Sequence, residues 1–210
     1  MMSIDGVNIL QGWMSDENGE FKAESLTELE KKAAEGNDDA QINLCALKAE
    51  NAENVKENLA FLEKHASTGN DRAFLFLGVL YHEGIAKNDS DGSQKILLSI
   101  DNKKSESYLE NVDVEKMPNA ALMLGMNTWF KCCVCVRNES ESEQESDYEK
   151  PTADDYIKGE KRLISLYEIA GKNTIEDWKK MAASWLSSLY AIEDTPVYNL
   201  EKSKYWENKA

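Results

Sequence analysis

Several features are scarce in this sequence, and each scarcity excludes a class of protein. The first ten residues, MMSIDGVNIL, contain neither a basic start nor a continuous apolar stretch. No later segment approaches the roughly 18 consecutive apolar residues that a membrane-spanning helix needs. We therefore expect a soluble chain that is neither exported nor embedded in a membrane.

Cysteine is also scarce, and its placement argues against disulfides. Three of the four cysteines, Cys132, Cys133 and Cys135, crowd into the apolar "CCVC", which is a poor disulfide framework and favours a reducing cytoplasm. Cys132 and Cys135 form a Cys-x-x-Cys, but a zinc site needs two further ligands and none lies nearby in the sequence. Core packing is favoured over a metal or redox role, since free cysteine usually behaves as a small buried hydrophobe.

Motifs of catalysis are missing as well. The chain has two histidines and no Gly-x-Ser-x-Gly, phosphate-binding loop, His-Glu-x-x-His or dinucleotide fingerprint. The segment KNDSDGSQKILL at 87–98 resembles a calcium loop at Asp89 and Asp91, but Lys87 and Leu98 stand where calcium needs acids. We predict no catalytic residue, no metal and no cofactor.

Basic residues are outnumbered. The chain has 24 Lys and Arg against 39 Asp and Glu, a net charge of −15 over 210 residues. Such a field repels nucleic acids and anionic membrane surfaces, so an electrostatic partner should be a basic protein. The alternative is that the acidity only keeps the protein soluble. The 41% of hydrophobic residues are enough for a sizeable core.

Alternating strand patterns are absent, and a repeat of helical patterns takes their place. AAEGNDDA at 33–40 returns 33 residues later as ASTGNDRA at 66–73. One stripe, spaced i, i+3, i+7, occurs as Leu26/Leu29/Ala33, Leu59/Leu62/Ala66, Leu163/Leu166/Ala170 and Ser203/Trp206/Ala210. A second, spaced i, i+4, i+5 with a small last residue, occurs as Ala40/Leu44/Cys45, Ala73/Leu77/Gly78, Ala120/Leu124/Gly125 and Ala182/Leu186/Ser187.

The patterns predict an all-α chain in which a glycine ends one helix and Asn or Asp caps the next. The small residue of the second stripe lets a neighbouring helix approach closely. The helices are expected at 25–35, 38–50, 55–67, 71–83, 91–100, 118–136, 152–170, 174–193 and 199–209.

Three stretches resemble Sel-like repeats, a branch of the tetratricopeptide-like α-solenoids: LEKKAAEGNDDAQINL (29–44), AFLFLGVLYHEGIAKNDS (73–90) and ASWLSSLYAIEDTPVYNLEKSKYWENKA (183–210). The family's tyrosine, glycines, Lys-Ala-x-x-Trp element and closing Lys-Ala-Ala-x-x-Gly are matched by Tyr81, Tyr190, Gly78, Gly84, Lys202, Ser203, Trp206, Lys32, Ala33, Ala34 and Gly36. The third copy is degenerate, because it lacks the Trp element and has gained length.

The resemblance implies a right-handed superhelix of αα-hairpins over residues 25–210, with about four helix pairs and a concave face that binds another protein. It implies no catalytic residue. Residues 1–24 match no repeat, and we expect them to form an N-terminal cap over the first helix pair or an extension.

Two groups of residues are candidates for partner binding. Aromatic side chains outside the repeated stripes can anchor a partner, and these are Phe74, Trp129 and Trp185. The insertion 137–151 is expected to be flexible, with too little apolar content to order itself. Either it is a solvated linker, or its acids dock a basic partner: Glu139, Glu141, Glu143, Glu145 and Asp147.

These observations predict a non-enzymatic, cytoplasmic protein-binding module that does not bind nucleic acid or membranes. A narrower hypothesis is an acidic immunity or inhibitor protein that neutralises a basic bacterial toxin or effector. The alternative is a regulatory scaffold or chaperone-like adaptor with an endogenous protein partner. The sequence leaves the oligomeric state open.

Overall fold

A computed structural model describes residues 26–88, 92–134 and 150–210. The chain forms two compact units, Met1–Asp113 and Val114–Ala210, hereafter unit 1 and unit 2. Residues 1–24, for which a cap or extension was predicted, lie outside the described residues, as does most of the predicted insertion, 137–149.

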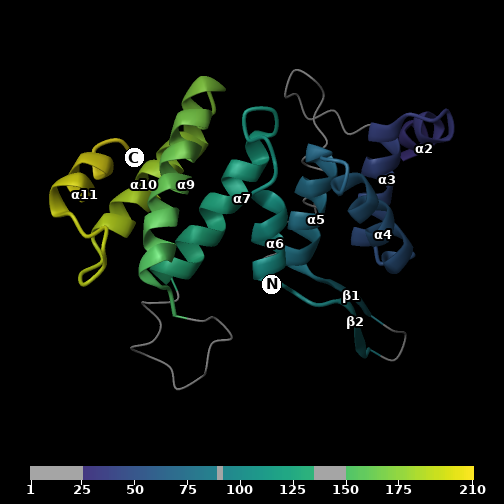
Figure 1. Cartoon of the computed structure of the whole chain (residues 1–210), viewed down its shortest axis with the longest axis horizontal. Coiled ribbons are helices and arrows are strands. Elements are labelled where there is room, and N and C mark those ends of the chain that lie inside the picture. The colour runs from purple at the N-terminus through teal and green to yellow at the C-terminus, as the bar shows by residue number, and fades with distance from the viewer. Residues whose placement is uncertain (1–25, 89–91, 135–149) are drawn as a thin grey trace. The chain divides into compact units, whose positions relative to one another are not determined.

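Unit 1 is a series of antiparallel helical hairpins with one short β-hairpin. Each helix from α2 to α5 packs on the next, α5 packs on α6, and α3 also contacts α5 (Figure 1). The elements are α2 (Leu26–Ala34), α3 (Asp38–Glu50), α4 (Val55–Ala66), α5 (Asp71–Glu83), β1 (Ile85–Asn88), β2 (Gln94–Leu98) and α6 (Asn102–Leu109). The fully buried side chains Ile42, Leu62, Leu77 and Leu109 lie in its core.

Unit 2 is also built of consecutively packed helices, of which α9 and α10 are the longest. α9 packs on α7 and on α10, and α10 in turn packs on α11. The elements are α7 (Pro118–Trp129), the π-helical turn η1 (Phe130–Val134), α9 (Ala153–Lys172), α10 (Glu176–Tyr190) and α11 (Leu200–Glu207). The all-α prediction is therefore confirmed as consecutively packed helices, while the handedness of a superhelix stays a prediction.

The repeated Gly-Asn-Asp sequence forms the predicted helix joint. Gly36 and Gly69 have φ of 89° and 83°, the left-handed conformation that favours glycine after a helix. The side chains of Asn37 and Asn70 then accept the backbone N–H of the residue three positions later, at 2.8 and 3.0 Å. The joint is therefore local chemistry that a short motif can encode.

The small residue of the second stripe allows close helix packing, as predicted. A Cβ added to Gly78 of α5 would lie 2.6 Å from Leu109 Cδ2 of α6. At the equivalent place in α10, Ser187 accepts at its carbonyl a hydrogen bond from Ser203 Oγ of α11, at 3.0 Å. The small residue at this position of the repeat thus sets how closely the next helix can approach.

The helix predicted at 91–100 is wrong. β2 pairs antiparallel with β1, with Ala86 opposite Ile96 and a shift of register between Ile85 and Ala86. Turn-forming residues interrupt the chain between the two strands, so the apolar KILL segment folds back on β1 and does not begin a helix. The helix follows later, as α6.

The third copy does contain a counterpart of the Trp element. α6 carries Lys104, Ser105 and Tyr108 at the spacing of Lys202, Ser203 and Trp206 in α11. Ser105 Oγ donates to the Gly78 carbonyl at 2.7 Å, as Ser203 does to Ser187. The expectation that this copy lacks the element is corrected, with tyrosine in the place of tryptophan.

Candidate functional site

The candidate site is an open groove of about 600 Å³ on unit 1, hereafter the α4–α6 groove. The end of α4 and its turn contribute Glu63, Ala66, Ser67 and Gly69 to its lining. Phe74 lines it from the first turns of α5, and Tyr108 and Asn111 from the end of α6. Three helices that are consecutive in the repeat thus supply one surface.

An acid, a base and two tyrosines form a network beside the groove. Glu63 Oε1 accepts hydrogen bonds from Tyr108 Oη at 3.3 Å, Tyr81 Oη at 3.4 Å and Lys104 Nζ at 3.3 Å. Lys104 Nζ also donates to Tyr81 Oη at 2.6 Å and lies 4.1 Å from the centre of that ring. Among the described residues, none donates to the second oxygen of Glu63, Oε2, which leaves this atom available as an acceptor.

The network changes the acidity of its members. Burial lowers the pKa of the Lys104 ammonium, but its hydrogen bonds to Tyr81 and Glu63 outweigh this and raise the pKa above its ordinary value. Burial and the neighbouring Glu63 carboxylate raise the pKa of Tyr108. Lys104 is therefore protonated and Tyr108 is neutral across the physiological range.

The carboxyl ends of two helices lie beside the groove. α4 ends at Ala66 and α6 ends at Leu109, and residues beside both ends line the groove. The carboxyl end of a helix carries a partial negative charge, which favours cations. The Phe74 and Tyr108 rings, with centroids 6.4 Å apart, add two faces that a cation can contact. The groove therefore combines acceptors of positive charge with apolar surface.

Unit 2 contains a related network, which helps to separate packing from function. Tyr190 Oη and Lys202 Nζ both donate to Glu160 Oε1, the latter at 3.0 Å, and Lys202 lies 4.8 Å from the Tyr190 ring centre. Tyr190 and Lys202 stand at the repeat positions of Tyr81 and Lys104. The contact of a lysine, a tyrosine and a glutamate is thus a packing feature that recurs in both units, and only the repeat position of the glutamate differs between them.

The predicted aromatic anchors fall into two groups. Phe74 is partly exposed and lines the groove, as an anchor would. Trp185 is 8% exposed in the core of unit 2 and stacks, with ring centroids 5.6 Å apart, on Trp129, which is half-buried and packs against that core. This burial leaves Trp185 little surface for a partner. The predicted acidic anchors at 139–147 lie outside the described residues.

Sequence reasoning missed Glu63, Tyr108 and Asn111. Glu63 is one of many acids, and its partners come from two other helices, so no local pattern identifies it. Tyr108 could have been found by aligning Lys-Ser-x-x-Tyr at 104–108 with Lys-Ser-x-x-Trp at 202–206.

The cysteines of η1 lie in the core. Cys132 and Cys133 are 1% and 3% exposed, and burial raises the pKa of the Cys132 thiol to about 12. Cys135, like Asp89 and Asp91 of the rejected calcium loop, lies outside the described residues. Over residues 26–88, 92–134 and 150–210, no group of three or more His, Cys, Asp and Glu side chains is arranged to hold a metal ion.

The structure defines the chain as an all-α protein of consecutively packed helical hairpins with an open groove on unit 1. Comparisons with protein-family models, with curated proteins and with solved structures give no match. In the part of the chain that the structure describes, no helix is both long enough and apolar enough to span a bilayer.

Proposed function

We propose that this chain is a Sel-like repeat protein that binds a basic protein partner and carries out no chemistry itself. The observation that carries the proposal is the α4–α6 groove, where an acid, two aromatic rings and two helix ends meet. An open surface of this kind suits a protein segment better than a small substrate, because an enclosed pocket buries most of a small ligand. Exposed aromatic side chains are typical anchors of protein interfaces.

The charge of the chain favours a partner of opposite sign. The net charge of −15 steers a basic protein toward the surface and accelerates encounter, especially at low ionic strength. We infer from this acidity that the chain is an immunity or inhibitor protein that neutralises a basic toxin or effector. The partner's basic surface would then be covered by the groove and its surroundings.

An affinity capture tests the proposal. The tagged chain, with and without residues 138–150, is exposed to lysate of its source cell at low and high salt, and the bound proteins are identified by mass spectrometry. We expect one stoichiometric basic protein that is lost at high salt. Loss of this protein on deletion of 138–150 would assign the acidic segment a docking role, and retention would make it a linker.

The same capture experiment distinguishes the inhibitor from the alternative function. A regulatory scaffold or chaperone-like adaptor would retain several endogenous proteins in place of one. Capture of no protein under any condition would contradict the proposed function.

A further inference from the structure

Two residues that line the α4–α6 groove in unit 1 have counterparts at the same repeat positions in unit 2. In the repeat, Ala66 of α4 corresponds to Ala170 of α9, so Glu63 corresponds to Tyr167 and Ser67 to Gly171. Two groove-lining positions of unit 1 can therefore be compared with positions of known surroundings in unit 2.

A lysine of the chain itself fills this place in unit 2. Lys179 Nζ lies 5.5 Å from the centre of the Tyr167 ring, a cation–π distance. Its Cε lies 3.9 Å from the position that a Cβ on Gly171 would take. The Lys179 side chain thus passes over both residues, with its charge on the aromatic face.

In unit 1, α5 lacks the helical turn that carries Lys179 in α10, and the ammonium that contacts Glu63 is that of Lys104 on α6. α10 begins at Glu176, six residues before Ala182, whereas α5 begins at Asp71, two residues before the equivalent Ala73. Lys179 lies in this additional helical turn. In unit 1 the same register position is Asn70, whose side chain caps α5 and is held by the Ala73 N–H. The place is therefore an open groove, and it has a carboxylate at Glu63 where unit 2 has a ring.

We propose that the α4–α6 groove binds a lysine or arginine side chain of the basic partner, in the place that Lys179 takes in unit 2. This inference rests on the proposed function. The charged group contacts Glu63 Oε2 and lies against the Phe74 and Tyr108 rings. The side-chain oxygen of Asn111, whose amide nitrogen donates to the Ser107 carbonyl at 2.7 Å, supplies a further acceptor at the groove's edge.

A titration of the full chain, labelled with nitrogen-15 and followed by NMR, tests this assignment. The probes are N-acetyl-arginine amide, N-acetyl-lysine amide and N-acetyl-citrulline amide, the last of which has nearly the shape of arginine without its charge. We expect the arginine and lysine probes to shift the amide signals of Ser67, Gly69 and Asn111 with dissociation constants on the order of millimolar. The citrulline probe should leave these signals nearly unchanged.

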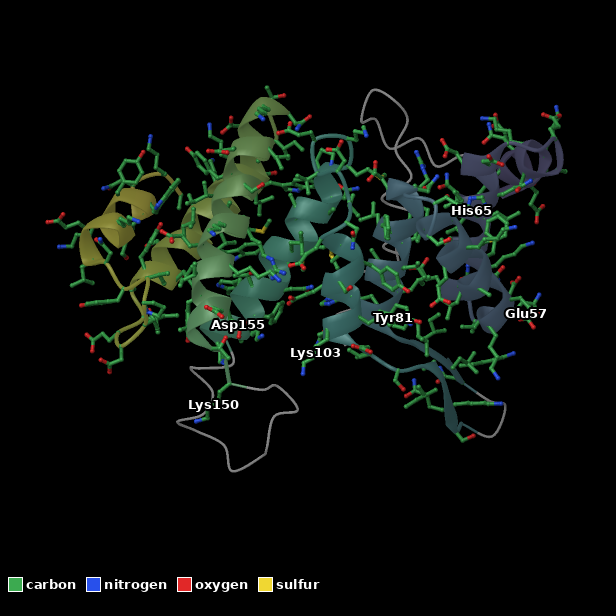
Figure 2. All side chains as sticks on the ribbon, viewed as in Figure 1. Glu57, His65, Tyr81, Lys103, Lys150 and Asp155 are labelled. Atoms are coloured by element: carbon green, nitrogen blue, oxygen red, sulfur yellow. The ribbon has the colours of Figure 1, made fainter. Side chains whose placement is uncertain are left out.

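Variants of the chain test whether the Glu63 carboxylate binds the charged probes. Glu63→Gln should weaken binding of the arginine probe about tenfold, the usual effect of losing one charge-assisted hydrogen bond. Glu57→Gln is the matched control, because Glu57 is an exposed acid on the outer side of the same helix (Figure 2). Ser67→Arg, at an exposed position, would place a cation in the groove from the chain itself and should abolish binding while Glu63 and its hydrogen bonds remain.

Three results would overturn the assignment: equal shifts with citrulline, shifts centred outside the groove, or an unchanged affinity of the Glu63→Gln variant. The capture experiment tests the proposed function independently of this titration. A basic protein retained equally by the native chain and by Glu63→Gln would refute the side-chain site and leave the proposed function intact. If the probes shift signals in the groove but no protein is captured, the proposed function is refuted and the side-chain site remains.

Discussion

Gly78→Ala tests the packing rule that the repeat encodes. The new Cβ would lie 2.6 Å from both Cγ and Cδ2 of Leu109, which is fully buried. Overpacking of this kind costs about 1–3 kcal/mol, while alanine gains about 1 kcal/mol over glycine inside a helix. We therefore expect Gly78→Ala to lower the free energy of unfolding by about 1 kcal/mol.

The sign should reverse when Leu109 is shortened. Leu109→Ala alone should cost about 2–5 kcal/mol, because it leaves a cavity against α5. In that background the alanine at 78 occupies vacated space and keeps its helical advantage, so it should stabilise by about 1 kcal/mol. The coupling between the two substitutions is then about 2 kcal/mol.

Urea unfolding followed by far-ultraviolet circular dichroism measures the four chains of this cycle. Tryptophan fluorescence follows unit 2 separately, since Trp129, Trp178, Trp185 and Trp206 all lie there while the two substitutions lie in unit 1. Gly171→Ala is the control, because its added Cβ would meet only one atom, at 3.9 Å, and should stabilise the chain. Additive effects of Gly78→Ala and Leu109→Ala would refute the close-packing explanation.

Three further predictions concern unit 2. Burial raises the pKa of Asp155, but bonds from Lys131 and from the Thr152 backbone and side chain outweigh it and lower the pKa to about 2 (Figure 2 labels Asp155). Its carboxylate therefore stabilises the fold above the ordinary pKa of 3.8, and this contribution is lost as the pH falls toward 2. Acid unfolding should show the loss in the native chain and not in Asp155→Asn. Burial and the hydrogen bond to Glu160 raise the pKa of Tyr190 to about 12, so absorbance titration should show a tyrosine ionising there that Tyr190→Phe removes. Cys132 should resist alkylation at pH 8 in the folded chain and react on unfolding, as mass spectrometry can show; rapid reaction in the folded chain would contradict its burial.

The sequence predicted the parts of the fold that depend on local chemistry. The joints at Gly36 and Gly69 and the small residue at Gly78 are encoded within a few positions, so their patterns were sufficient. The hairpin was missed because strand pairing joins Ala86 to Ile96, ten positions apart, and helical periodicity does not report such contacts.

The candidate site was less predictable for a related reason. Phe74 was identified as an aromatic residue outside the stripes, but nothing local distinguishes it from Trp185, which is core. Glu63 becomes important only because Tyr81, Lys104 and Tyr108 converge on it from two other helices. Such convergence depends on helix packing, which single-sequence patterns do not specify.

Binding of a basic partner side chain in the α4–α6 groove is tested most directly by calorimetric titration of the captured partner with three chains: native, Glu63→Gln and Glu57→Gln. Both variants lose one negative charge from α4, so long-range attraction falls equally in the two. If the groove binds a basic side chain of the partner, Glu63→Gln should weaken binding about tenfold or more and Glu57→Gln should match the native chain within about twofold. Equal affinities of all three chains would contradict the claim.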